Sequence, residues 1–354
     1  MEKSSLGNIS HISQGCRLTK NVMTQNFRIQ LYGHQWAQRL LRRAVQQGTT
    51  RHSYLFLGPE HIGKTTLARA FAQALTCENP TENDGLGACG HCRSCRLAAE
   101  NTHPDHRLFA PAGNQLLIEQ ARKIIHEASL SPVESRYKVF IITAFERANV
   151  NTANALLKTL EEPSATTRII LVSHQPSGLL DTIISRCQLL RLRPLPEQTI
   201  VQMLMEQVAV SKTVAHRLAR LSNGRPGTAL TLAQEPEAWQ TYNQRIDEML
   251  ELLKSSTVER MAFAKDLEKA PNLDTTLQEW LLWWRDVLIL QHSSPAFVIN
   301  QEHLAKLTEL ANTVPPSQAR RFIEAIMTTS VYLRKNVNRQ LALEVLLLKA
   351  PTQA

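Results

Sequence analysis

A phosphate-binding loop is the strongest chemical motif in the sequence. The segment GPEHIGKT fits the pattern G-x-x-x-x-G-K-[ST], directly after an apolar stretch and before a helix-like one. In such a loop, glycines let backbone N–H groups surround a pyrophosphate, the lysine reaches the terminal phosphates and the threonine hydroxyl ligates Mg²⁺. The alternative is a loop retained only as part of the fold. The predicted residues for binding ATP and Mg²⁺ are Gly58, Gly63, Lys64, Thr65 and Thr66.

A cluster of cysteines is the second motif. Its members are Cys77, Cys89, Cys92 and Cys95. Two C-x-x-C steps share Cys92, and closely spaced thiolates suit tetrahedral Zn²⁺. Four protein ligands leave no open position for a substrate, so the predicted zinc is structural. His91 or His103 could replace one thiol, and free or redox-active cysteines are the alternative.

The segment KVFIITAFERAN, residues 138–149, is notable for what it lacks. An enzyme that hydrolyses ATP on a phosphate loop normally carries acids at the end of such a strand, to organise Mg²⁺ and to orient the attacking water. Thr143 and Ala144 hold these degenerate acid positions. Glu146 is the nearest acid, and we expect it to lie already on the following loop.

The remaining motifs lie in residues 149–195. A helix with Ala153, Leu156, Leu157 and Leu160 on one face should end at Pro163, so most of this segment is packing. The tripeptide SRC that follows has no meaning by itself. Its Cys187 is expected to pack in the core rather than to bind metal.

Length and composition limit the class of protein. The chain has 354 residues, 43% of them hydrophobic, and a net charge of +9, which permits contact with nucleic acid but also serves solubility. The N-terminal segment lacks the apolar core of a signal peptide, and no apolar run reaches membrane-spanning length. We therefore expect a cytoplasmic protein without membrane contact.

Hydrophobic patterns then predict the elements that position these motifs. Apolar strands are predicted in SYLFLGPE, in VFII at 139–142 and in RIILVS at 168–173, each followed by helix-like or loop sequence. Such strands indicate a parallel sheet covered on both faces. Before them, Leu31, Trp36, Leu40, Leu41 and Val45 recur at helical spacings.

After RPLP the strand signals stop and helices take over. Short amphipathic segments cover 197–207, 213–224 and 227–234, and longer helices follow. Trp280, Trp283 and Trp284 could be imagined as a platform for stacking bases, but their helical spacing favours a packing face. The predicted fold class is α/β plus all-α. The predicted division is a mobile tail at 1–26, a P-loop domain at 27–195 with a zinc module at 77–95, a small helical domain at 196–236 and a helical domain at 237–354.

These motifs together resemble a known family, the AAA+ subunits of the bacterial DNA polymerase III clamp loader. HSYLFLGP, GKTTLARAFAQAL, the four-cysteine insertion, NALLKTLEEP and SRC stand in the family's order over residues 27–195. The resemblance implies a RecA-like sheet domain with a zinc-binding insertion, a helical lid and a helical collar for oligomerisation. It implies gamma/tau and delta subunits, the sliding clamp and primed DNA as partners.

Within the family, the sequence is most like the delta-prime branch, which does not hydrolyse ATP efficiently. Gamma/tau motors have Asp-Glu where this chain has Thr143-Ala144, and an arginine where GRPGTAL places Gly227, with Arg225 displaced. The resemblance gives Arg186 of SRC the role of an arginine finger acting on a neighbour's ATP; a surface salt bridge is the alternative. An active gamma/tau-type ATPase and an unrelated zinc-containing P-loop phosphotransferase remain the rival functions.

A last expectation concerns DNA. The helical segment LLIEQARKIIHEA presents Arg122 and Lys123 on a largely polar face, and the corresponding region of the family lines a spiral around primer-template DNA. The alternative is that both charges are simply solvated.

Overall fold

The computed structural model describes residues 26–81, 85–113, 115–176, 178–270, 273–333 and 337–351. The tail predicted at 1–26 therefore lies outside the described residues, except for Asn26. No helix among the described residues is long and apolar enough to cross a membrane.

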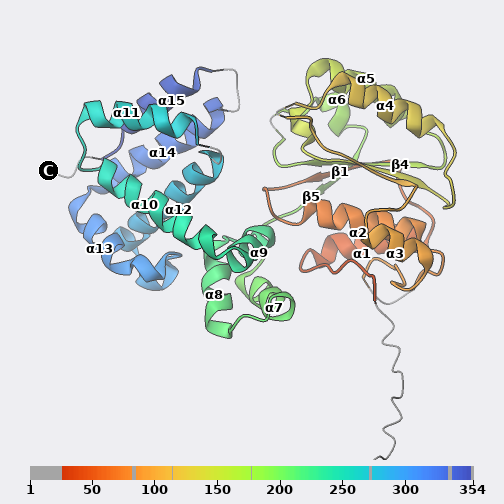
Figure 1. The fold of residues 1–354 in the computed structure, drawn as a ribbon, viewed down its shortest axis with the longest axis horizontal. Helices are drawn as coiled ribbons and strands as arrows, with labels where there is room; N and C mark the ends of the chain where they lie inside the picture. The colour runs from red at the N-terminus through yellow and green to blue at the C-terminus, as the bar shows by residue number, and fades with distance from the viewer. Residues whose placement is uncertain are drawn as a thin grey trace, which may run out of the picture.

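A five-stranded parallel sheet forms the N-terminal half, in the strand order β2-β3-β4-β1-β5. The helices α1, α2 and α3 cover one face of the sheet, and α4, α5 and α6 cover the other (Figure 1). The central strands are buried along their whole length because apolar residues point toward both helical layers. The strands are β1 (Ser53–Leu57), β2 (His106–Phe109), β3 (Lys138–Ile142), β4 (Thr167–Ser173) and β5 (Gln188–Arg191).

The three predicted strands are confirmed as β1, β3 and β4. The sequence patterns did not indicate the two edge strands, β2 and β5. Both are short, only partly buried and interrupted by polar residues, so they lack the continuous apolar run that marks a central strand.

The helices around the sheet follow the apolar pattern in most places. In α5, Ala153, Leu156 and Leu160 are buried, Leu157 is partly buried, and the helix ends shortly before Pro163, as predicted. In α1, Leu41 is buried, but Trp36 and Leu40 are 45% and 40% exposed. The helices are α1 (Gln35–Gln46), α2 (Lys64–Thr76), α3 (Arg93–Ala99), α4 (Ile118–Ser129), α5 (Val150–Glu161) and α6 (Asp181–Ile184), with the 3₁₀ helix η1 (Phe145–Arg147).

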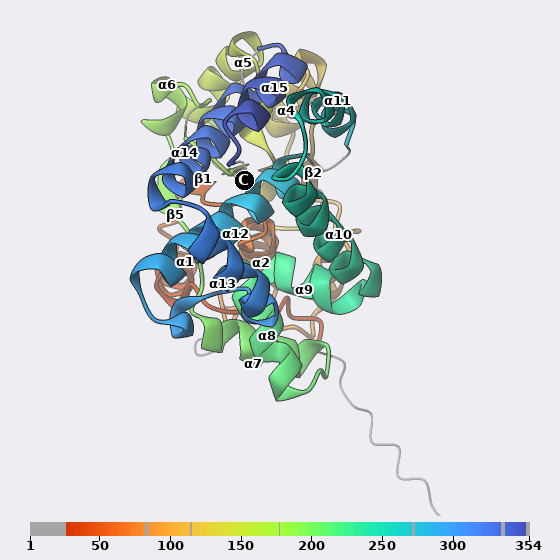
Figure 2. The same ribbon diagram turned by 90° about the vertical axis from the view of Figure 1, so that its left-hand side faces the viewer.

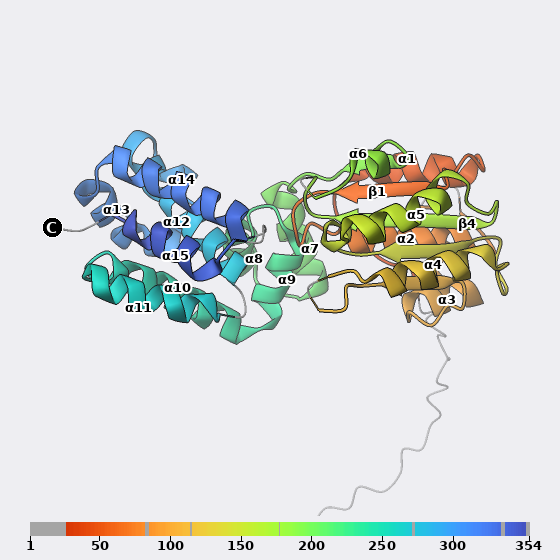
Figure 3. The same ribbon diagram turned by 90° about the horizontal axis from the view of Figure 1, so that it is seen from above.

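Three short helices follow and enclose a hydrophobic core of their own. They confirm the helical segments predicted after RPLP, and they lie between the sheet and the C-terminal helices (Figure 3). Pro226 is the first residue of its helix, where its missing N–H needs no partner. The helices are α7 (Glu197–Gln207), α8 (Lys212–Leu221) and α9 (Pro226–Gln234).

The C-terminal helices pack around a separate core at the end of the molecule away from the sheet (Figure 1), and Figure 2 views them from that end. Trp280, Trp283 and Trp284 are at most 1% exposed, which confirms the predicted packing face and excludes a surface platform for bases. The helices are α10 (Pro236–Leu252), α11 (Thr257–Glu268), α12 (Leu273–His292), α13 (Leu304–Thr313), α14 (Pro316–Leu333) and α15 (Arg339–Leu348), with the 3₁₀ helices η2 (Pro295–Phe297) and η3 (Gln301–His303).

Candidate functional site

The phosphate loop has the backbone that its glycines predict. It connects β1 to α2, and Gly63 takes the left-handed conformation at the N-cap of α2, with φ 94°. At Gly58 a Cβ atom would lie 2.5 Å from the carbonyl oxygen of Leu192, so only glycine fits. The loop thus turns tightly and begins a helix at the position where a phosphate would be bound.

Lys64 is turned toward the loop's own backbone. Its Nζ donates hydrogen bonds to the carbonyl oxygens of Gly58, at 2.7 Å, and Pro59, at 2.5 Å. Burial lowers the pKa of Lys64 to about 8, although the negative charges of Glu146 and Glu60 oppose this shift. The ammonium group is therefore poorly solvated and already has acceptors within the protein.

A hollow of about 380 Å³ lies beside this loop. It brings together Gly63, Lys64, Thr65 and Thr66, which the sequence had predicted to bind nucleotide. The other walls come from the segment before α1 and from the three-helix unit, which contribute Tyr32, His34, Met203 and Leu230. This hollow is therefore the candidate site for a nucleotide.

Thr143 and Ala144, at the two positions where acids are missing, have structural roles. The backbone N–H and the hydroxyl group of Thr143 both donate to the carbonyl oxygen of Phe109, at 2.8 and 3.1 Å. Ala144 is left-handed, with φ 48°, a strained conformation for alanine. Neither side chain supplies a carboxylate to organise Mg²⁺ or orient water, and the hydroxyl group of Thr143 is already bonded to Phe109.

Glu146 lies on η1, close to the loop but already engaged. Its carboxylate is 2% exposed and contacts Nδ1 of His174 at 2.6 Å, and the backbone N–H of His174 donates to it at 3.2 Å. Burial raises the pKa of Glu146, but hydrogen bonds from His174 and Ser173 outweigh this and hold it below its usual value. Glu60, on the phosphate loop, also approaches His174, at 3.6 Å.

The sequence analysis missed His174 and Glu60. One signal was present: His174 directly follows a buried parallel strand, and side chains at the carboxyl ends of neighbouring strands meet at one edge of a sheet. Glu146 was recognised only as the nearest acid, and its partner could not be inferred from spacing.

The three-helix unit contacts the loop through Gly227. Its N–H donates to the carbonyl oxygen of His61 at 2.8 Å, and a Cβ atom at this position would lie 3.0 Å from that oxygen. Arg225 donates a hydrogen bond to the side chain of Gln278 on α12, and its positive charge adds to burial in lowering the pKa of Lys64 on the loop. The helix α9 therefore meets the loop backbone to backbone, with no cationic side chain between them at Gly227.

The four predicted cysteines converge. The Sγ atoms of Cys77, Cys89, Cys92 and Cys95 all lie within 4.8 Å of one another. Backbone N–H groups point at three of these sulfurs, including those of Cys89 on Cys77 and of Cys95 on Cys92, both at 3.3 Å. Such amides stabilise thiolates, and tetrahedral zinc with Zn–S bonds of about 2.3 Å needs sulfurs at similar spacing. The donor set fits structural Zn²⁺, and no histidine belongs to it.

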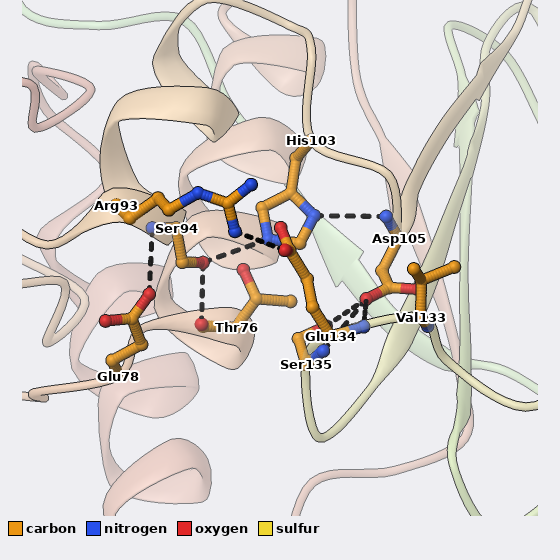
Figure 4. A network of polar contacts seen from close by, with 9 residues as sticks. All are labelled: Thr76, Glu78, Arg93, Ser94, His103, Asp105, Val133, Glu134 and Ser135. Carbon is orange, nitrogen blue, oxygen red and sulfur yellow. Dashed lines mark hydrogen bonds and ion pairs between the residues drawn. The ribbon is translucent and has the colours of Figure 1, made fainter.

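A polar network attaches this cluster to the sheet (Figure 4). The buried carboxylate of Asp105 accepts hydrogen bonds from the backbone N–H groups of Val133, Glu134 and Ser135. His103 links the backbone N–H of Asp105 to the hydroxyl group of Ser94 on α3. His103 is thus a connector between the cysteine module and the loop before β3, rather than a metal ligand.

Arg186 lies at the surface after α6. Its guanidinium pairs with Glu161 and donates to the carbonyl oxygen of Thr182 at 2.8 Å.

The predicted DNA contact lies on α4. Its residues Arg122 and Lys123 are exposed, and Lys123 lies 4.0 Å from Glu127 one helical turn away. Arg122, Lys123 and Arg186 lie far in sequence from the phosphate loop, and none lines its hollow.

The strand order, the phosphate loop and the helical units after the sheet define an AAA+ protein with a RecA-like core. Family profiles described as "DNA polymerase III, delta subunit" and "DNA polymerase III, delta subunit, C terminal" match residues 33–196 and 236–351.

Individual relatives define the branch. The chain is 30% identical to DNA polymerase III subunit delta' of Bacillus subtilis, over 88% of this chain and 94% of that protein. It is 32% identical to subunit delta' of Escherichia coli, over 86% and 90%. DNA polymerase III subunit tau of E. coli is 28% identical, over 94% of this chain but 55% of tau. The chain belongs to the delta-prime family of DNA polymerase III subunits.

Proposed function

We propose that this chain is the delta-prime component of a clamp loader, which supports ATP-driven loading of a sliding clamp onto primed DNA. Its partners would be gamma/tau and delta subunits, the clamp, and DNA contacted through the complex. The similarity to two delta-prime subunits along most of both chains carries this proposal. It also disfavours the small-molecule phosphotransferase that the sequence alone left open.

In this function the chain does not hydrolyse ATP efficiently itself. Three features support this: Thr143 and Ala144 stand where the acids are needed, Gly227 supplies no cation, and Lys64 is occupied by backbone oxygens. The tau relative keeps the motor interpretation as the alternative. Steady-state hydrolysis by the isolated chain that is abolished by Lys64→Ala would favour that alternative.

Arg186 would act on the ATP of a neighbouring motor subunit. A fixed cation stabilises the charge that develops on the transferred phosphoryl group. Its exposure supports this role. Its pair with Glu161 is the surface salt bridge of the alternative, but exposed pairs contribute only about 0.2–1 kcal/mol, so the arginine could exchange Glu161 for a phosphate.

Single-turnover ATP hydrolysis in a reconstituted clamp loader tests this role. Arg186→Ala should leave assembly intact and lower the rate at one motor site, by as much as about 10³-fold. Because other sites share turnover, the fall for the whole complex would be smaller. Glu161→Gln is the matched control, since it breaks the same ion pair but keeps the arginine. Equal rates at every motor site for Arg186→Ala and wild type would leave this subunit as a scaffold alone.

Nucleotide binding at this chain's own loop would be weak and without turnover. The hollow beside Thr65 and Thr66 supports binding, whereas the internal bonds of Lys64 oppose it. Titration with a fluorescent ATP analogue distinguishes the two: identical curves for wild type and Lys64→Ala would leave the loop with only a structural role.

We also propose that Arg122 and Lys123 contact DNA phosphates in the assembled complex. Exposure of both side chains on α4 supports this. Loss of both charges should reduce the salt dependence of DNA binding by the complex. An unchanged slope for Arg122→Ala/Lys123→Ala would mean that these charges are only solvated.

We also propose the domain division that the sequence predicted, in which the tail at 1–26 lies outside the described residues except for Asn26. Separate hydrophobic cores support an AAA+ domain at 27–195, a lid at 196–236 and an oligomerising collar at 237–354. Limited proteolysis should cleave first near residues 195 and 236. Early cleavage within the sheet domain would contradict this division.

A further inference from the structure

The helix α1 and the turn that leads into β1 form a surface without negative charge. Residues 28–59 include Arg39, Arg42, Arg43 and Arg51 but no Asp or Glu. Among the described residues, the guanidinium groups of Arg39, Arg43 and Arg51 form no ion pair or hydrogen bond. Elsewhere in the chain, arginines such as Arg93 and Arg245 pair with carboxylates. This surface therefore holds a concentration of uncompensated positive charge.

Exposed apolar side chains lie between these arginines. Trp36, Arg39, Leu40 and Arg43 follow one another at spacings of three and one along the helix, so they share its outer face. Ala37 and Leu41 occupy the opposite face and are fully buried. The indole ring of Trp36 is thus not needed for the core, although 45% exposure is unusual for so large an apolar group.

A hollow of about 640 Å³ extends this face toward the sheet. Its lining includes Leu40, Arg43, Arg51, His52 and Gln188, with two arginines, one histidine and no acid. The pKa of His52 is lowered, first by burial and then by the positive charges of Arg168 and Arg51, which agrees with an electropositive environment. We call Trp36, Arg39, Leu40, Arg43 and Arg51 the α1 surface.

The α1 surface is separate from the DNA contact proposed above. The helix α1 covers one face of the sheet, whereas α4, which carries Arg122 and Lys123, covers the other (Figure 1). Because the two helices lie on opposite faces, a straight segment of nucleic acid that runs along one face of the sheet cannot contact both.

We propose that the α1 surface binds single-stranded DNA without sequence preference, directly by this chain. Arg39, Arg43 and Arg51 would bind successive phosphates, because a guanidinium donates two parallel hydrogen bonds to phosphate oxygens. Trp36 would stack on a base, which requires an unpaired base with an accessible face. Leu40 would contact the same base or its sugar. An acidic protein segment could pair with the arginines, but its carboxylates would not stack on the exposed indole ring of Trp36.

Binding of the isolated full-length chain to labelled oligothymidine of about 20 nucleotides, followed by fluorescence anisotropy, tests the proposal. The titration is repeated between about 50 and 200 mM salt. For Arg39→Ala/Arg43→Ala, the slope of log affinity against log salt should become shallower by about 0.7 for each lost phosphate contact. Trp36→Ala should weaken binding about fivefold or more while leaving that slope nearly unchanged.

A matched control removes the same charge elsewhere. Arg320 and Arg321 are exposed on α14, and Arg320→Ala/Arg321→Ala should leave affinity and slope close to those of wild type. Circular dichroism of each variant confirms that the fold is retained. An equal loss in the α14 control would show only an effect of net charge and would overturn the proposal.

Two further outcomes would also overturn it. One is wild-type binding to oligothymidine that does not respond to the α1 substitutions. The other is tighter binding of polyglutamate than of DNA with the same dependence on Arg39 and Arg43, which would assign the surface to an acidic protein partner. Because all these measurements use the isolated chain, they stay independent of clamp loading and of Arg186.

Discussion

The phosphate loop and the cysteine module are both strong sequence motifs, but their side chains are used differently. In the module, four sulfurs converge within 4.8 Å and backbone amides point toward them. In the loop, Lys64 binds backbone oxygens of its own turn, and the carbonyl oxygen of His61 binds Gly227. One motif directs its polar atoms toward a common point, where an ion fits. The other satisfies them with protein atoms, so a retained motif does not by itself mean retained chemistry.

Removal of the metal should have the largest effect. Cys92→Ser replaces a thiolate by a poor zinc ligand, and structural zinc sites bind with roughly 10–16 kcal/mol. We expect zinc content to fall well below the one equivalent of wild type and residues 77–95 to become sensitive to protease. Because Cys89 and Cys95 also pack in the core beneath the sheet, thermal stability should fall as well.

Cys187→Ser is the control for this change. Cys187 is half-buried outside the cluster, and burial raises the pKa of its thiol to about 12, so it is a poor metal ligand. Its variant should retain zinc. Less than about half an equivalent of zinc in purified wild-type protein would argue against a four-thiol site altogether.

The buried charge of Lys64 should appear in the pH dependence of stability. The folded chain releases this proton near pH 8, whereas the unfolded chain holds it to about 10.5. Between these values the unfolded state binds more protons, so stability rises with pH. Relative to Lys64→Met, wild type should gain about 1–3 kcal/mol across this window in urea unfolding. Parallel pH profiles for the two proteins would show that Lys64 is not desolvated.

A side chain at Gly227 should weaken the contact between the three-helix unit and the loop. Gly227→Ala places a Cβ atom 3.0 Å from the carbonyl oxygen of His61, and crowding of this kind costs about 1–3 kcal/mol. The higher helix propensity of alanine offsets up to about 1 kcal/mol. We expect a net loss near 1 kcal/mol in urea unfolding. Thr228→Ala, in the same helical turn, is the control, and a stabilised Gly227→Ala would refute the close approach.

Restoring the acids should have the smallest effect. Thr143→Asp/Ala144→Glu supplies both carboxylates, but Gly227 still provides no arginine and Lys64 keeps its internal acceptors. Phosphate release by the isolated variant should stay close to that of the same variant carrying Lys64→Ala. A rise of more than about tenfold above that background, or about 1.4 kcal/mol in activation free energy, would mean that the acids alone were limiting.

Prediction from sequence succeeded where the signal is local and continuous. The strands β1, β3 and β4 each contain a continuous run of at least four apolar residues, and the four cysteines are close in the chain, so both could be recognised without a structure. The edge strands β2 and β5 could not, because each has four residues, only two of them apolar. In α1, helical spacing predicted the helix but not that Trp36 and Leu40 would remain exposed, because periodicity does not say which neighbours cover a face.

The sequence by itself determined the α/β and helical halves, the phosphate loop, the cysteine set and the absence of acids at Thr143 and Ala144. These depend on residue type and on near neighbours in the chain. Only the tertiary structure decided that Glu146 contacts His174, that Gly227 meets His61 and that Arg186 meets Glu161, because each pair joins elements distant in sequence. Such pairs come together only when whole helices and strands pack against one another. A local sequence pattern does not encode that packing.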